Sequence, residues 1–349
     1  MKCLILILTI ISMVSCADGH TVMYPQYGTF PIKKNLVANI LPLDTALLRY
    51  PFRIKIKDSL ALIMDIHNID NYFHLFHYPE MTHIVSFGHR GDSPEDMLSA
   101  DSFAFQSLDS IWTLDANKMQ IIRWEITNRN YKVKMVESIN LNKKIVRALD
   151  FIRIDNDFVI PDYLAKSRYY LVNSYGETFA EKGNIPTIHY KSEYSMPALA
   201  QAWRSFIDYN SQNNILAFVT QLGEVIEIYN LKNNTHIVLY GPNGEPNFEI
   251  SNGYSIPTGI MGFSDVEVTD KYIYTVFHGR TFKEIANRIQ EGSQSIDGGK
   301  YIYVFSLTGE PVCCYTLDRY IYGIDVNEEK GIITAVDVNS DEPIVQYKI

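Results

Sequence analysis

Residues 102–138 read SFAFQSLDSIWTLDANKMQIIRWEITNRNYKVKMVES. This stretch contains four short runs of β-branched and aromatic residues, separated by residues that favour turns. The runs cover residues 102–106, 110–114, 119–126 and 132–138. In the third run Ile122, Trp124 and Ile126 alternate with charged residues, a period of two that is typical of a half-buried strand. The stretch therefore predicts a sheet of four strands.

The same pattern occurs six times along the chain. A polar break, a β-type run, a short turn and a second run begin at residues 58–65, 109–115, 157–162, 214–221, 271–278 and 330–337. The copies are about 48 to 59 residues apart, a spacing that is typical of repeat proteins built from blades. Four-stranded sheets repeated around an axis form a β-propeller, so the sequence predicts an all-β fold of this kind.

The number of strands favours six blades. Five complete blades are expected at residues 51–88, 102–139, 147–183, 202–241 and 262–318. The sixth begins at Tyr322, but the chain ends after only three further strands. Residues 36–41 are apolar enough to supply the missing strand, which would pair the two chain ends and remove exposed sheet edges. We therefore expect a ring that is closed by N- and C-terminal strands.

The N-terminus has the features of an export signal. Lys2 precedes an apolar stretch, residues 4–13, which is too short to span a bilayer. Residues 13–16, Met-Val-Ser-Cys, resemble a bacterial lipobox, in which the cysteine is lipidated. The resemblance implies a signal peptide over 1–15, a tether over 16–35 anchored through Cys16, and a propeller domain over 36–349. It places the protein in a bacterial cell envelope, on the outer membrane; the alternative is a plain secretory signal.

One junction between blades carries a family resemblance. Residues 85–97, VSFGHRGDSPEDM, resemble the signature FG-x-x-G-x-G-P-x-E-F of bacterial six-bladed propellers, and residues 239–248 are a shorter copy. With the lipobox and the chain length, this resembles the TolB-like six-bladed propeller lipoproteins. Ser93 replaces one glycine of the signature. Gly88 and Gly91 are expected to adopt positive φ where the chain crosses between blades.

Composition narrows the range of partners. A formal net charge of −9, without a cluster of basic residues, argues against nucleic acid. The 24 tyrosines and 17 phenylalanines suit strand packing, and some could form stacking surfaces for a sugar or peptide. Neither a nucleophile elbow, nor a phosphate loop, nor a His-Glu-x-x-His motif occurs in the sequence. Cys313 and Cys314 are adjacent in a strand and point to opposite faces, so a disulfide between them is not expected.

Four acidic residues end the second strands of their blades at equivalent positions: Asp65, Asp115, Asp162 and Asp337. A carboxylate at a strand end can cap backbone N–H groups of the following turn, and this role would recur with the repeat. The alternative is that some of them face the channel and bind a divalent cation such as Ca²⁺, as in propeller lactonases. No cofactor is otherwise expected.

Departures from the repeat are candidates for function. Polar and aromatic residues at the blade openings could gather at one channel mouth and bind an anionic or glycan-like ligand. These candidates are His67, Arg147, Asp150, Tyr163, Trp203, Arg204, His278 and Arg280. After Arg280 comes an insertion, residues 281–300, with a short helical pattern. It is a candidate lid or partner contact, since function in repeat scaffolds tends to lie in such loops; the alternative is a tolerated surface excursion.

Three functions are compatible with the sequence. The leading hypothesis is a non-enzymatic envelope lipoprotein that binds a protein, peptide or glycan on one propeller face. The second is a metal-dependent hydrolase or lyase of the lactonase type at the channel mouth. The third is an assembly subunit whose insertion docks on a neighbouring envelope protein. Fold alone does not choose among them.

Overall fold

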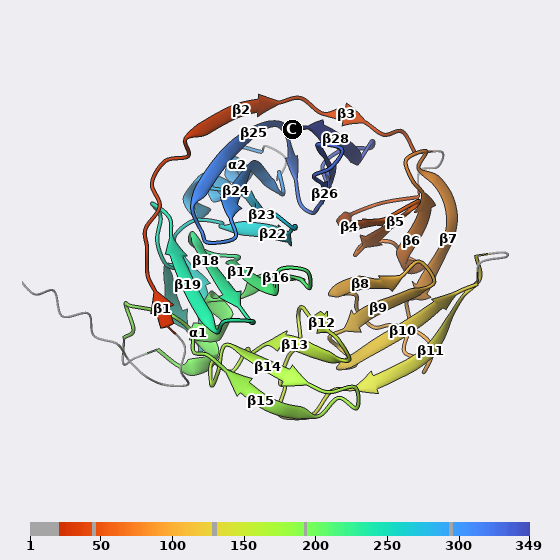
Figure 1. Cartoon of the computed structure of the whole chain (residues 1–349), viewed down its shortest axis with the longest axis horizontal. Coiled ribbons are helices and arrows are strands. Elements are labelled where there is room, and N and C mark those ends of the chain that lie inside the picture. The colour runs from red at the N-terminus through yellow and green to blue at the C-terminus, as the bar shows by residue number, and fades with distance from the viewer. Residues whose placement is uncertain (1–20, 44–46, 128–130, 192–193, 293–295) are drawn as a thin grey trace, which may run out of the picture.

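Six β-sheets surround a central channel, as the sequence predicts (Figure 1). The computed structural model describes residues 21–43, 47–127, 131–191, 194–292 and 296–349. The lipidation site expected at Cys16 lies outside these residues. Each blade has four antiparallel strands running from the channel outward, and two blades carry a fifth strand.

The first three blades follow the chain without interruption. Blade 1 consists of β4 (Pro51–Lys57), β5 (Leu60–Asp65), β6 (Asn71–His77) and β7 (Thr82–His89). Blade 2 consists of β8 (Ser102–Ser107), β9 (Ser110–Asp115), β10 (Gln120–Ile126) and β11 (Val133–Asn140). Blade 3 consists of β12 (Ile152–Ile154), β13 (Asp157–Pro161), β14 (Tyr169–Val172) and β15 (Thr178–Lys182).

The last three blades each take a strand from the N-terminal segment. Blade 4 consists of β16 (Ser205–Asn210), β17 (Ile215–Thr220), β18 (Val225–Asn230), β19 (Thr235–Tyr240) and β1 (Thr21–Met23). Blade 5 consists of β22 (Phe263–Val268), β23 (Tyr272–Phe277), β24 (Gly299–Ser306), β25 (Pro311–Ile321) and β2 (Ile32–Leu36). Blade 6 consists of β26 (Ile324–Asn327), β27 (Ile332–Val336), β28 (Ile344–Lys348) and β3 (Asn39–Ile40).

The expected closure of the ring is confirmed. β3 pairs antiparallel with β28, with Ile40 opposite Val345 and Asn39 opposite Gln346. The Leu41 N–H adds a bond of 2.9 Å to the Ile344 carbonyl. Strand β3 and the last strand of the chain therefore lie side by side on the rim of blade 6 (Figure 1). Pairing of the chain ends covers the open edge of β28.

The tether expected over residues 16–35 is too long, because the folded domain includes residues from Thr21 onward. β1 runs parallel to β19, and β2 runs parallel to β25, so the segment follows the outer rim of blades 4 and 5 (Figure 1). Tyr27 and Phe30 between them are buried against Phe305. The sequence does not show this arrangement because rim strands face solvent: Ile32 to Asn35 are exposed, which leaves no apolar alternation.

The acidic residues at the strand ends cap turns, as the repeat predicts. The Asp65 carboxylate accepts the backbone N–H groups of His67 and Asn68, and Asp115 accepts those of Asn117 and Lys118. Asp162 and Asp337 do the same in their own blades. These carboxylates are part of the repeat and hold the turns of four blades.

The blade junction after β7 depends on its two glycines in different ways. Gly88 has φ +70°, as expected for the crossing between blades. Gly91 does not have positive φ, so that expectation is wrong; instead a Cβ there would overlap the Asp96 carboxylate. Gly91 is therefore required by close packing and not by its backbone conformation.

Three elements lie outside the blades. Helix α1 (Met196–Ala202) precedes blade 4, and the hairpin of β20 (Phe248–Ser251) and β21 (Tyr254–Pro257) follows it. Helix α2 (Phe282–Gln290) forms the first part of the predicted insertion and confirms its helical pattern. No helix among the described residues is long and apolar enough to cross a membrane. Cys313 and Cys314 are buried free thiols on β25.

Candidate functional site

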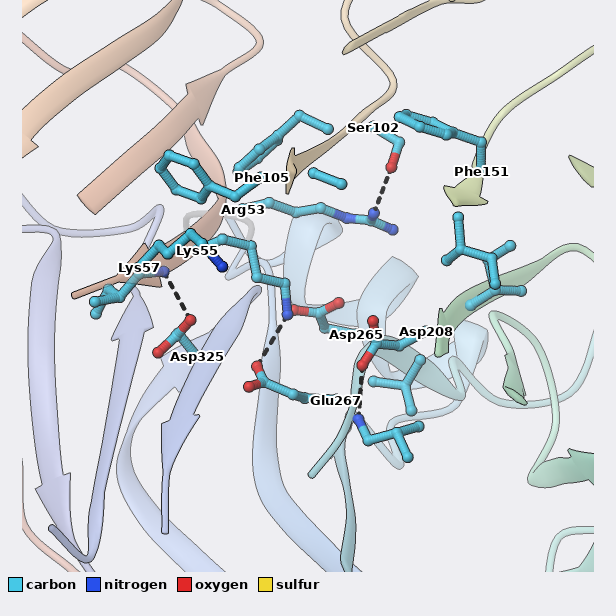
Figure 2. A pocket seen from close by; sticks show the side chains of 17 residues that line it. Arg53, Lys55, Lys57, Ser102, Phe105, Phe151, Asp208, Asp265, Glu267 and Asp325 are labelled. Carbon is cyan, nitrogen blue, oxygen red and sulfur yellow. Dashed lines mark hydrogen bonds and ion pairs between the residues drawn. The ribbon is translucent and has the colours of Figure 1, made fainter. Parts of the chain in front are cut away.

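The first strand of every blade lines the channel. A cavity of about 250 Å³ lies among these strands, with residues from β4, β8, β16, β22 and β26 and from the start of β12 in its wall (Figure 2). We call the end of the channel at which these strands begin the upper mouth, and the end at which they finish the lower mouth. The wall between them is strongly charged.

Carboxylates in the channel wall join neighbouring blades at four of the six junctions, from blade 3 through blades 4, 5 and 6 to blade 1. Asp208 of blade 4 accepts the Val268 N–H of blade 5 at 2.7 Å (Figure 2). Asp325 of blade 6 accepts the Ile56 N–H of blade 1, also at 2.7 Å. Equivalent bonds run from Ile207 N–H to Asp150, from Ile324 N–H to Asp265 and from Val326 N–H to Glu267. Neighbouring inner strands do not form a common sheet, so these bonds take the place of a ladder.

Two cations of β4 complete the wall. Arg53 donates hydrogen bonds from both terminal nitrogens to the Asp150 carboxylate of blade 3, at 3.2 and 2.9 Å. It also donates a hydrogen bond to the Ser102 hydroxyl of blade 2. Lys55 lies 2.9 Å from Glu267 of blade 5 (Figure 2). Buried charges are tolerated when they are paired and hydrogen-bonded in this way, although removing them from water still costs free energy.

Two other carboxyl groups of the wall, those of Asp208 and Asp325, have raised pKa values. Burial raises the pKa of Asp208 to about 7, with Lys55 opposing and Glu267 adding to the rise. Burial and Glu267 raise the pKa of Asp325 to about 8. Among the described residues no three His, Cys, Asp or Glu side chains are grouped so that they could hold a metal ion. The wall is best explained as the structural fastening of the ring.

The upper mouth has a different character, because its polar groups lack partners. The guanidinium of Arg204, just before β16, lies 6.0 Å from the centre of the Phe206 ring and has no hydrogen-bond or ion-pair partner in the part of the chain that the structure describes. The Tyr163 hydroxyl in blade 3 is buried and also without a partner within these residues. Burial raises the pKa of Tyr163, while the charge of Arg204 lowers it, so the two side chains interact electrostatically.

Aromatic rings of blades 1 and 6 line the opposite side of this mouth. Tyr322, before β26, packs on Phe52 with ring centroids 4.3 Å apart. Its pKa is raised by burial and lowered by Arg204, so Arg204 acts on both sides of the mouth. The buried His278 ring lies edge-on to Tyr322, with centroids 6.0 Å apart. A guanidinium, an unpaired hydroxyl and apolar ring faces therefore meet at one opening.

The structure places six of the eight predicted site residues in three locations. Tyr163 and Arg204 lie at the upper mouth, and exposed Arg147 is near enough to lower the pKa of Tyr163. His278 and Arg280 line a separate pocket beside helix α2. His67 is exposed on the same side and packs on Tyr50, with ring centroids 4.5 Å apart.

Two of the eight do not fit the prediction. The Trp203 side chain is 1% exposed and packs in an apolar core with Leu199 and Val238, so it offers no stacking surface. Asp150 is committed to Arg53 in the channel wall. A sequence shows that Trp203 opens a blade, but not whether its side chain turns toward the channel or packs between elements. It likewise does not show that Asp150 is bonded to Arg53, which lies 97 residues away.

The sequence itself identifies the fold family. The profile of the TolB-like 6-blade propeller-like family matches residues 29–329. The chain belongs to this family. A comparison with curated proteins found no match.

Two solved structures from Bacteroides resemble this TolB-like propeller. One, named as an exported protein of Bacteroides fragilis, has 11% identity and a TM-score of 0.55, covering 94% of this chain and 99% of its own. The other, a DUF4221 family member from Bacteroides vulgatus, has 11% identity and a TM-score of 0.60, covering 90% and 97%. At such identities the likeness concerns the fold alone.

Several residues of the site in this TolB-like propeller were missed from the sequence. Tyr322 and Phe52 at the mouth read only as strand-type aromatics, because nothing local distinguishes them from the other rings. The channel charges did leave a signal: Arg53 and Lys55 are two apart, as are Asp265 and Glu267. Charges with a period of two in the first strand of a blade indicate a polar channel face.

Proposed function

We propose that this TolB-like propeller is an exported lipoprotein of a bacterial cell envelope that binds a protein, peptide or glycan ligand at its upper mouth. The lipobox-like residues 13–16 support the export and the anchor. Several acyl chains on Cys16 would provide stable membrane attachment. The described domain begins at Thr21, so the anchor would hold the propeller close to the membrane surface.

The observation that carries the binding role is the presence of two unpartnered polar groups, those of Arg204 and Tyr163, at the upper mouth. Within the described residues, neither the Arg204 guanidinium nor the buried Tyr163 hydroxyl has a polar partner. A buried polar group without a partner costs about 1–3 kcal/mol, so its persistence favours a ligand that completes the bonds. The rings of Tyr322 and Phe52 beside them suit the apolar face of a sugar or a peptide side chain.

The channel carboxylates support the metal-dependent alternative less well. They are bonded to backbone N–H groups of neighbouring blades, and within the described residues no three His, Cys, Asp or Glu side chains are grouped so that they could hold a metal ion. We therefore place the proposed function at the mouth and not in the channel.

Site-specific photo-crosslinking in the native host tests the binding role. A benzophenone amino acid at position 163 should form a covalent product, and Arg204→Gln should reduce its yield by about tenfold, since charge-assisted bonds are the strongest polar contacts. The same probe at Asn156, in the β12–β13 turn at the lower mouth, is the matched control. A parallel glycan array with the purified domain covers ligands that crosslink poorly. Products of equal yield at both mouths, or no ligand in either assay, would contradict the proposal.

The anchor has its own test. Cys16→Ala should release the protein from membranes into the soluble fraction and abolish its labelling by radioactive palmitate. A variant that still partitions with membranes and still labels would contradict the lipoprotein assignment without affecting the binding role.

A further inference from the structure

A second hollow lies between helix α2 and the edge of blade 5. Its volume is about 490 Å³, almost twice that of the channel cavity. Helix α2 contributes one wall, and β24 and the end of β25 contribute the other. We call it the α2 pocket; its lining residues used below are His278, Arg280, Glu284, Arg288, Lys300 and Tyr320.

The α2 pocket gathers positive charge. Arg280, Arg288 and Lys300 all line it, and none of them has an ion pair within the described part of the chain. The Glu284 carboxylate offsets part of this charge, but it forms no ion pair with the three cations among the described residues; it accepts the Thr281 N–H and hydroxyl at 2.8 and 2.9 Å in a capping box. The other carboxylate of the lining belongs to Glu291, which is not part of the capping box. The three cations outnumber the two carboxylates of the lining, so the pocket keeps an excess of positive charge.

Buried polar atoms of the pocket also lack partners. The His278 side chain is 4% exposed, and neither of its ring nitrogens is hydrogen-bonded within the described residues. Burial, with the charge of Arg280, lowers the pKa of His278 to about 3, so the ring is neutral near pH 7 and carries one donor and one acceptor. The Arg280 Nε–H is buried and likewise unpaired within these residues. Such atoms are rare in native proteins and mark a place where a ligand or water completes the bonds.

The cations are held in position before any ligand arrives. Arg280 donates from Nη2 to the Gly298 carbonyl at 3.0 Å. The charged ends of Arg280 and Lys300 each lie 5.1 Å from the centre of the Tyr320 ring. A register shift in the β24–β25 ladder between Gly299 and Tyr301 lies beside Lys300, and irregularities of this kind re-aim side chains next to binding sites. Preorganised cations lose little entropy on binding.

We propose that the α2 pocket binds a carboxylate or phosphate group of a small ligand, with Arg280 and Lys300 as the charged contacts and His278 as a neutral hydrogen-bond donor. This inference rests on the proposed function, because His278 also packs against Tyr322 of the upper mouth and so joins the two sites. A ligand lying across the mouth would place its anionic group under α2.

Calorimetric titration of the purified domain tests the inference with three probes: glucuronate, inorganic phosphate and glucose. Glucuronate and phosphate should bind at low ionic strength, and neutral glucose should bind at least about tenfold more weakly than glucuronate. Arg280→Gln and Lys300→Gln should each weaken both anions by about tenfold or more. The matched control is Lys271→Gln, which removes the same charge from an exposed turn of the same blade on the opposite side.

Three outcomes would overturn the inference. They are no binding of either anion, binding of glucose as tight as that of glucuronate, and a loss in Lys271→Gln equal to that in Arg280→Gln. Failure of the two proposals is distinguishable. If the anions do not bind but the Arg204-dependent crosslink at position 163 persists, the ligand is not anionic and the binding role stands. If the anions bind but no Arg204-dependent product forms, the α2 pocket acts without the mouth.

Discussion

Arg168, which lies before β14 in blade 3, donates from Nε to Glu227 of β18 in blade 4 at 2.7 Å. The same guanidinium bonds Ser205, and Tyr229 donates to the other oxygen of Glu227 at 2.8 Å. Both charged side chains are almost completely buried. Burial by itself would raise the pKa of Glu227, but Arg168, His236 and Tyr229 hold it below its ordinary value. The pair joins two blades because every charge in it is satisfied.

Glu227→Ala should lower the free energy of unfolding by about 3–5 kcal/mol, because it leaves Arg168 buried without its partner. Glu125→Ala is the control, since Glu125 lies 3.9 Å from Lys134 in an exposed pair worth well under about 1 kcal/mol. Urea denaturation of the two variants measures the difference. Equal losses would show that burial does not determine how much each ion pair contributes to the free energy of unfolding.

The channel carboxylates predict how stability depends on pH. The folded-state pKa of Asp208, about 7, and of Asp325, about 8, are above the ordinary value of 3.8. These two carboxyls therefore bind more protons in the folded protein than in the unfolded chain between about pH 4 and 8, which makes stability fall as pH rises. Below about pH 6.5 the lowered pKa values of His74, about 4, and His278, about 3, act in the opposite direction, so the fall should appear above that pH. We expect a loss on the order of 1–3 kcal/mol between pH 6.5 and 9.

Asp325→Asn should flatten this dependence. The amide oxygen can still accept the Ile56 N–H, while the negative charge that repels Glu267 is gone. Thermal unfolding of both proteins at a series of pH values is the measurement. A wild-type protein as stable at pH 9 as at pH 6.5 would show that these carboxyls titrate normally.

At the scale of single elements, the N-terminal segment is held by a few aromatic contacts. Phe30 packs on Tyr303 and Phe305, with ring centroids 4.6 and 5.3 Å apart, while most of β2 is exposed. Phe30 therefore anchors β2 to blade 5 more than any side chain of β2 except buried Leu36.

Phe30→Ala should cost about 3 kcal/mol, or less if β2 detaches before the rest of the protein unfolds. Hydrogen exchange should then increase selectively at the backbone amides of β2 and of its partner β25. Val37→Ala is the control, because that side chain is 77% exposed and its loss should change exchange little. Increased exchange spread evenly over all six blades would contradict a local anchoring role.

At the scale of the whole molecule, the ring depends on a short seam. β3 contributes only the residue pairs Asn39–Gln346 and Ile40–Val345, supported by the Leu41 N–H. In the other five blades the four main strands follow one another in sequence, so blade 6 is where the closed ring can open. An open β28 would expose unpaired backbone groups to other chains.

Two N-terminal truncations test this seam. A chain starting at residue 37 lacks β1 and β2 but keeps β3, and should stay monomeric. A chain starting at residue 42 lacks β3 as well, and should lose at least about 2 kcal/mol more and self-associate through β28. Light scattering and urea denaturation of the pair measure both effects. If both chains are monomeric and equally stable, β3 is not needed for closure.

Local pattern determined much of this protein before any tertiary contact was known. The alternation in residues 119–126 depends only on the pleat of a strand, so it specified β10 correctly. The acids Asp65, Asp115, Asp162 and Asp337 recur with the repeat and cap turns only two or three residues away. The helical spacing in the insertion and the missing strand of blade 6 were likewise visible in the chain.

What the tertiary structure decided lies between blades. Whether Trp203 or Arg204 faces the mouth depends on how the chain enters the first strand of blade 4. The neighbouring residues in the sequence do not indicate this orientation. Arg53 meets Asp150 from 97 residues away, and Tyr27 meets Glu224 from 197 residues away. The α2 pocket needs Arg280, Arg288 and Lys300 to be brought together by a helix and a strand. Strand pattern is a property of adjacent residues, whereas these contacts exist only when the ring closes.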